Sequence, residues 1–236
     1  MRWIFVGLLM TLVAGILFLP LRLVVNRLAP GLEADTIEGS IWNGQLRNAR
    51  WQEVPLGDLD VGLEFLSLFT GKANLNFTRL QPELNGRLGG NRKLIRIEGL
   101  EGELRLALLP APLPEIGLQF AGVSAVFEKS RGCISTGGVV TATIKGLPII
   151  GDAPPLSGAP RCDGDALFVP LVATSGQIGL DLWLWQDGRY RGGLRVSKPS
   201  PLVQIALIAT GFTPVDGGVA LFAEGRAGKM PMLVKG

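Results

Sequence analysis

The sequence predicts a mainly β protein. We expect a single N-terminal transmembrane helix, then a curved antiparallel β-sheet or partial barrel with one short helix near residues 200–211. Three observations support this fold class. The first 25 residues are almost wholly apolar, short runs of alternating apolar and polar residues follow, and 33 of the 236 residues are glycine. Glycine at about twice its usual share, without a three-residue period, excludes collagen and is typical of turns and bulges.

Residues 3–25 form the first expected element. They read WIFVGLLMTLVAGILFLPLRLVV, and Arg22 is their only charged residue. About 20 apolar residues span a hydrocarbon core of roughly 30 Å, which predicts a transmembrane helix. A cleaved signal peptide is less favoured because Pro30 would occupy the first mature position, and a buried core helix is a weaker alternative. We therefore assign residues 1–28 to an anchor and residues 29–236 to a periplasmic β-rich domain.

Alternation with a period of two dominates the chain after the anchor. Such runs, bounded by glycine and proline, predict antiparallel strands with one buried face. They lie at residues 58–65, 74–78, 100–108, 116–120, 140–145, 178–185, 194–196 and 219–223. Proline-rich stretches at 110–114 and 154–160 interrupt the pattern without changing it. One continuous sheet is therefore favoured over two subdomains.

One helix interrupts this pattern. Ser200 is a natural N-cap, Pro201 suits the first helical position, and Gly211 suits the position after the helix. The residues between them are almost wholly apolar. We expect this helix to plug an open end of the sheet. The alternative is a helix that binds a partner or dips into a membrane.

Two tryptophans lie within the run at 178–185. Trp183 and Trp185 alternate with Leu182 and Leu184, so they project from the opposite face of the same predicted strand. The favoured interpretation is a core strand covered on both sides. The alternative is an exposed aromatic contact surface.

Cys133 and Cys162 are the only cysteines. In an oxidising compartment they favour a disulfide over reactive thiols. The bridge would close a loop of about 30 residues and stabilise the fold by about 3.5 kcal/mol.

The chain contains no histidine. This excludes Ser-His-Asp and Cys-His triads, and two cysteines cannot form a four-cysteine zinc site. Asp163-Gly164-Asp165 lacks the glutamate that closes a calcium loop. Glu101 and Glu103 share a strand face, which is typical of a solvated surface. We therefore expect no enzyme, no catalytic residue, no metal and no cofactor.

The basic residues do not indicate nucleic-acid binding. The net charge is +3, and two of the arginines belong to the anchor, which leaves the remainder close to neutral. Local clusters occur at 87–96 and 189–195, and neither has interleaved aromatic residues suited to stacking bases. Solvated strand faces are the favoured explanation, and contact with anionic lipid headgroups is the alternative.

A short motif opens the series of strands. It reads Gly39-Ser40-Ile41-Trp42-Asn43-Gly44, with Trp51 and Leu56-Gly57 following. This G-[ST]-[IV]-W-x-G element resembles the type II secretion system protein N family, as does the plan of one anchor, a β-rich exported domain and a late cysteine pair. The chain departs from the family in the strand after Leu-Gly, where Phe65 stands and members often carry a tryptophan. The implied aromatic packing is therefore altered.

The resemblance implies a non-enzymatic accessory or scaffold component of the type II secretion apparatus. It implies a place at the bacterial inner membrane, other secretion components as partners, and a role in exporting folded proteins across the outer membrane. Trp42 would anchor a strand in the core, and Gly39 and Gly44 would allow close approach or bulges. The alternative is an AsmA-like protein that binds or transfers membrane lipid in a hydrophobic groove. Neither interpretation fixes an oligomeric state.

Overall fold

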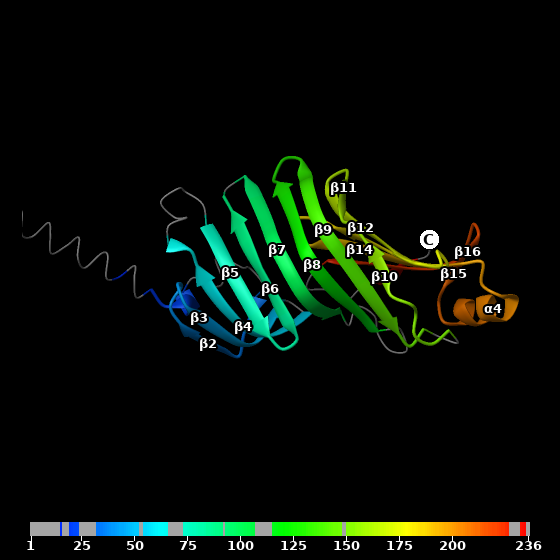
Figure 1. Ribbon diagram of the computed structural model, residues 1–236, viewed down its shortest axis with the longest axis horizontal. Coiled ribbons are helices and arrows are strands. Elements are labelled where there is room, and N and C mark those ends of the chain that lie inside the picture. The colour runs from blue at the N-terminus through cyan, green and yellow to red at the C-terminus, as the bar shows by residue number, and fades with distance from the viewer. Residues whose placement is uncertain are drawn as a thin grey trace, which may run out of the picture.

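The computed structural model describes residues 15, 19–23, 32–51, 54–65, 73–91, 93–106, 115–147, 150–226 and 232–234. Within these residues a long antiparallel sheet curls along the length of the molecule (Figure 1). The strands are β1 (Leu32–Glu33), β2 (Thr36–Gly39), β3 (Gly44–Trp51), β4 (Val54–Leu63), β5 (Ala73–Leu80), β6 (Glu83–Gly90), β7 (Leu94–Leu106), β8 (Glu115–Glu128), β9 (Gly132–Lys145), β10 (Leu156–Gly158), β11 (Arg161–Asp163), β12 (Ala166–Ala173), β13 (Ile178–Leu184), β14 (Arg189–Ser197), β15 (Thr213–Val215), β16 (Gly218–Arg226) and β17 (Met232–Val234).

The strands pair antiparallel and mostly with their neighbours in sequence. From β3 to β9 each strand pairs with the next, β9 pairs with β10, and β10 pairs with β12. The series continues through β13, β14 and β16. Short strands complete both edges, because β1 and β2 pair with β3, while β15 and β17 pair with β16. The described strands thus form an open, curved meander, as the alternating pattern predicts.

One face of the sheet, the inner face, carries the buried apolar side chains in two cores. The larger core joins β8 and β9 to β12, β13, β14 and β16, which run behind them in Figure 1. The smaller core lies at β2, β3 and β4 and contains Leu21, Ile41, Leu46, Ala49, Leu59 and Val61. The opposite face is the outer face. This division follows from the two-residue period, because successive side chains of a strand point to opposite faces.

The expected helix is present as α4 (Pro201–Ala209). Ser200 precedes it in extended conformation, and Gly211 follows it with a φ of +106°. Leu207 is fully buried in the larger core, so α4 covers one end of that core. Figure 1 shows α4 at one end of the molecule and β2 with β3 at the other.

Most of the predicted transmembrane segment, residues 3–25, lies outside the described residues. In the part of the chain that the structure describes, no helix is long and apolar enough to cross a membrane. The end of the segment is described from Leu19 to Leu23. Pro20 forms a β-bridge with Ser40, and Leu21–Leu23 form the 3-10 helix η1. Leu21 is only 2% exposed in the smaller core and Leu19 packs against that core, whereas Leu23 is 62% exposed.

Candidate interaction surface

The outer face of β11 to β16 carries an unusual density of aromatic and arginine side chains. Because Leu180 and Leu182 of β13 point toward the larger core, Trp183 and Trp185 project from the outer face. Both tryptophans are half-buried. Among the described residues, arginine side chains lie over the two rings and no second layer of strands covers them, so this strand is better described as an aromatic contact surface than as a doubly covered core strand.

Five side chains on adjacent strands form a row that we call the aromatic–arginine ladder. They are directly opposite one another in the sheet register: Arg161, Phe168, Trp183, Arg191 and Glu224. The Phe168 and Trp183 rings stack with centroids 4.6 Å apart. The guanidinium of Arg161 lies 4.9 Å from the Phe168 ring, and that of Arg191 lies 5.8 Å from the Trp183 ring. Arg191 also pairs with Glu224 at 3.1 Å.

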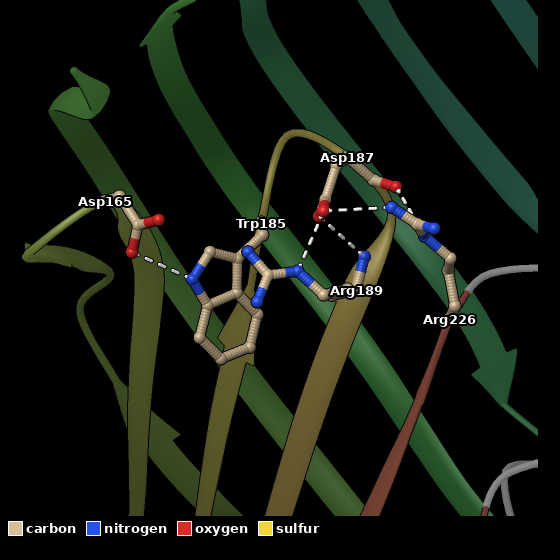
Figure 2. A network of polar contacts seen from close by, with 5 residues as sticks. All are labelled: Asp165, Trp185, Asp187, Arg189 and Arg226. Atoms are coloured by element: carbon tan, nitrogen blue, oxygen red, sulfur yellow. Dashed lines mark hydrogen bonds and ion pairs between the residues drawn. The ribbon is translucent and has the colours of Figure 1, made fainter. Parts of the chain in front are cut away.

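A second group lies at the neighbouring ends of the same strands (Figure 2). The indole Nε1 of Trp185 donates a hydrogen bond to Asp165 at 2.9 Å, and the Arg189 guanidinium lies 5.1 Å from the Trp185 ring. Asp187 accepts hydrogen bonds from Nε of Arg189 at 2.8 Å and from Nη2 of Arg226 at 3.0 Å. This network joins the turn before β12, the turn after β13, and the ends of β14 and β16.

The electrostatics of this second group favour the ionised form of Asp187. Partial desolvation raises the pKa of Asp187, but hydrogen bonds from Arg189 and the charges of Arg189 and Arg226 outweigh it and hold that pKa below its ordinary value. Asp163 accepts a hydrogen bond from the Trp183 indole at 3.1 Å. Both tryptophan N–H groups are therefore satisfied, and both rings are held in one orientation.

The arrangement suits contact with another macromolecule. Cross-strand pairs of this kind stabilise a sheet, and that is one role of the ladder. The exposed fractions of its charged side chains, 44% for Arg191 and 46% for Glu224, leave them accessible. Tryptophan and arginine are the residues that most often dominate binding energy at protein interfaces. The tryptophan rings that contact Arg189 and Arg191 do not belong to the run at 189–195, because the neighbouring strand and the turn after it supply them.

The other basic cluster lies on the outer face of β5 to β7. Arg87 lies 3.4 Å from Glu64 and 3.9 Å from Glu98, and its Nε donates to Asn76 at 3.0 Å. Hydrogen bonds from Asn74, then Asn76, lower the pKa of Glu64. Asn76, Arg87 and Glu98 border a shallow depression of about 350 Å³. Arg87 is thus held within a solvated strand face, and Arg92 of this cluster lies outside the described residues.

The residues of the sequence motif lie in the turn between β2 and β3. Gly39 ends β2 with a φ of +81°, and a Cβ there would lie 2.4 Å from the Asn43 carbonyl oxygen. Gly44 begins β3, and a Cβ there would lie 2.4 Å from Leu21. Trp42 is half-buried and meets Phe65 edge to face at 5.2 Å. Phe65, the departure from the family pattern, is therefore the aromatic partner of Trp42.

Two further motif residues lie on the following strands. Trp51 ends β3 opposite Val54 and Leu32. Gly57 lies in β4 opposite Ala49 and has a φ of +74°, a conformation that favours glycine.

The two cysteines form the disulfide expected from the sequence. Cys133 of β9 and Cys162 of β11 have Cα atoms 5.4 Å apart. The Cys133 amide donates to the Asp165 carbonyl at 3.0 Å. The bridge thus fastens β11 and the turn before β12 to β9, directly beside the aromatic–arginine ladder.

Three of the acidic residues considered for chemistry have structural partners. Asp163 and Asp165 accept the tryptophan N–H bonds described above, and Glu103 accepts a hydrogen bond from Arg105 at 2.9 Å. Among the described residues, no group of three or more His, Cys, Asp or Glu side chains is placed to hold a metal ion.

Fold and surface together define a class of protein: an open, curved antiparallel sheet that displays fixed aromatic and arginine side chains on its outer face. Comparison with known families is more specific. The model of the family described as Type II secretion system (T2SS), protein N matches residues 30–221, and the chain belongs to this family. The predicted family is therefore confirmed.

A curated relative agrees with this assignment. The protein named Type II secretion system protein N of Vibrio cholerae serotype O1 is 38% identical over 96 residues, which are 37% of this chain. The match covers 38% of that relative's length. No solved structure matches the chain.

Proposed function

We propose that the chain is a non-enzymatic accessory or scaffold component of the type II secretion apparatus. Its N-terminal segment holds it at the bacterial inner membrane, its β-rich domain lies in the periplasm, and it helps export folded proteins across the outer membrane. Family membership supports a place in this system. The observation that carries the scaffold role is the aromatic–arginine ladder, which offers other secretion components a contact surface.

The ladder is suited to binding because it is ordered in advance. Stacking of Phe168 on Trp183 and the ion pair of Arg191 with Glu224 restrict the side chains before a partner arrives. Binding therefore costs less side-chain entropy than it would at a mobile surface. The absence of histidine from the whole chain further favours a binding role over catalysis.

The disulfide supports the proposed compartment. Disulfides persist in oxidising compartments such as the bacterial periplasm, and the bond between Cys133 and Cys162 lies within the domain assigned there. We also propose that the motif serves structure. Gly39 and Gly44 allow close approach at a tight turn, and Trp42 packs against Phe65.

Affinity purification tests the proposed contact. The full-length chain, extracted from membranes in mild detergent, should retain other type II secretion proteins, which mass spectrometry identifies. Replacing Arg189→Glu together with Arg191→Glu should reduce their recovery, because it removes the three cation–π contacts that these two arginines make and creates repulsion with Asp187 and Glu224. Arg105→Glu is the matched control, since Arg105 is also an exposed outer-face arginine beside a carboxylate.

A further variant separates charge from shape. Arg191→Lys keeps the positive charge and loses the planar group that stacks on Trp183. We expect intermediate recovery of the partners. Equal recovery with the wild type, the double variant and the control would contradict a contact through this surface, and retention of no secretion protein by the wild type would contradict the scaffold role.

The alternative function, lipid binding in a hydrophobic groove, is favoured by one observation. Leu88 of β6 and Ile95 of β7 lie on the inner face between the two cores and are 39% and 49% exposed. An acyl chain could cover them. Mass spectrometry of a mild extract should then show lipid that stays bound to the wild type and is lost from the Leu88→Asp variant.

A further inference from the structure

The solvent-facing side of α4 is strongly apolar. Leu202 is 81% exposed, Ile205 67% and Ile208 39%, while Leu207 on the opposite side is fully buried. The three exposed residues are spaced three apart, so they form one strip along the helix, which we call the α4 strip. The helix has no acidic or basic residue in its first or last turn. Its solvent side therefore has the composition of a buried surface.

The α4 strip lies on a protruding end of the molecule. Figure 1 shows α4 at the end of the long axis opposite to β2 and β3. A nine-residue helix is about 13 Å long. A short, convex apolar surface at a tip can insert into a lipid bilayer, because lipid chains rearrange around it. A folded protein partner would need a groove of matching shape.

The exposed area of the strip also distinguishes a protein partner from a membrane. Three aliphatic side chains expose on the order of 300 Å² here, well below the ~800 Å² that each partner contributes to a stable protein–protein interface. The same area suffices for a peripheral membrane contact, which scales with apolar area and adds to other attachments. The strip is thus too small for a second copy of the chain and adequate for lipid.

The charged residues beside the helix indicate whether headgroup charge or apolar burial drives the contact with lipid. Lys198 precedes α4, and its amide donates to the Gly217 carbonyl at 2.8 Å, which places the turn of Asp216 beside it. Both charged residues are exposed. One charge of each sign gives no net attraction for anionic headgroups, so the contact is driven by apolar burial.

We propose that α4 is a lipid-contact helix that inserts the α4 strip into the interfacial region of a bilayer. The inference rests on the proposed placement in the cell envelope, where a bilayer is available. It gives the domain an attachment of its own, at the end of the sheet opposite to Leu19–Leu23. In this position α4 restrains how the curved sheet is oriented relative to a membrane.

Photocrosslinking in a defined bilayer tests the proposal. The full-length chain, with a photoreactive phenylalanine analogue in place of Ile205, is reconstituted in vesicles of phosphatidylethanolamine and phosphatidylglycerol and irradiated. Mass spectrometry then counts lipid adducts. The matched control carries the analogue at Leu80, which is 76% exposed on β5. We expect about tenfold more lipid adducts at position 205, because only α4 inserts.

Two further measurements define the outcome. Leu202→Asp in the chain labelled at 205 should reduce lipid adducts severalfold, and raising the salt to about 0.5 M should leave the wild-type yield unchanged. Equal lipid adducts at 205 and 80, or adducts at 205 with a second copy alone, would overturn the proposal. Since the vesicles contain no secretion protein, this result is independent of whether the scaffold role holds.

Discussion

Arg79 of β5 provides the sharpest test of how the curled sheet is held together. It lies on the inner face, between the two cores, and is only 4% exposed. Its Nε donates to the Pro82 carbonyl at 2.7 Å, its Nη1 to the Leu56 carbonyl at 3.0 Å, and its Nη2 to the Glu103 carbonyl. One guanidinium thus joins β4, the turn after β5, and β7. Burial lowers the pKa of Arg79, and the Glu103 carboxylate opposes that effect.

The informative perturbation is Arg79→Met, which keeps an unbranched side chain, although a shorter one, and removes its donors. Each carbonyl left without a partner costs about 1–3 kcal/mol, so three acceptors cost about 3–9 kcal/mol. The guanidinium no longer has to be desolvated, and that relief is worth several kcal/mol. We therefore expect a net loss of about 3 kcal/mol in the free energy of unfolding.

Urea unfolding of the detergent-solubilised full-length chain, followed by tryptophan fluorescence, measures this loss. The control is Arg105→Met, because the Arg105 side chain is 76% exposed and pairs with Glu103. A surface ion pair contributes at most about 1 kcal/mol. If both variants unfold at the same urea concentration, water satisfies the three carbonyls and the bridging role of Arg79 is refuted.

Three further predictions concern other parts of the sheet. Reducing the Cys133–Cys162 bond, whose residues are 29 apart in sequence, should lower the free energy of unfolding by about 3.5 kcal/mol, and an unchanged urea midpoint in reductant would contradict this. Gly102→Ala should lower the free energy of unfolding by about 1–3 kcal/mol more than Gly99→Ala does. Both glycines have positive φ, but only at Gly102, of the two, would a Cβ lie 2.0 Å from a backbone oxygen. Similar urea midpoints for the two variants would refute the steric argument. A backbone hydrogen bond, assisted by a neighbouring arginine, lowers the folded-state pKa of Asp58, so its stabilising effect is present above its ordinary pKa and is lost as pH falls through the lowered value. The stability difference between wild type and Asp58→Asn should therefore shrink in urea titrations below about pH 4, and a constant difference would show that the carboxylate charge is not the cause.

Local pattern was sufficient for the strands and for the helix. Alternation at Leu59 and Val61 predicted the buried side of β4, and Ser200 with Gly211 bounded α4 correctly. These features depend on residues a few positions apart, which the sequence displays directly. The disulfide was equally accessible, because the chain offers only two cysteines.

The candidate surface could be predicted only in part. Trp183 and Arg191 were noted separately, but Phe168 and Glu224 were not connected with them. Their contact depends on the pairing register of β12, β13, β14 and β16, and a shift of one residue would move each side chain to the other face. Register depends on the turns and on which face of each strand is buried, and it brings together residues that lie far apart in the sequence.

The sequence by itself determined a β-rich chain with one short helix, one disulfide and a composition that disfavours catalysis. Only the tertiary structure decided which apolar residues lie inside. Leu21 belongs to the apolar run assigned to a membrane helix and is buried under β3, whereas Leu202 belongs to the helix expected to plug the sheet and is 81% exposed. Hydropathy reports how strongly a side chain avoids water, and only the packed chain decides what covers it.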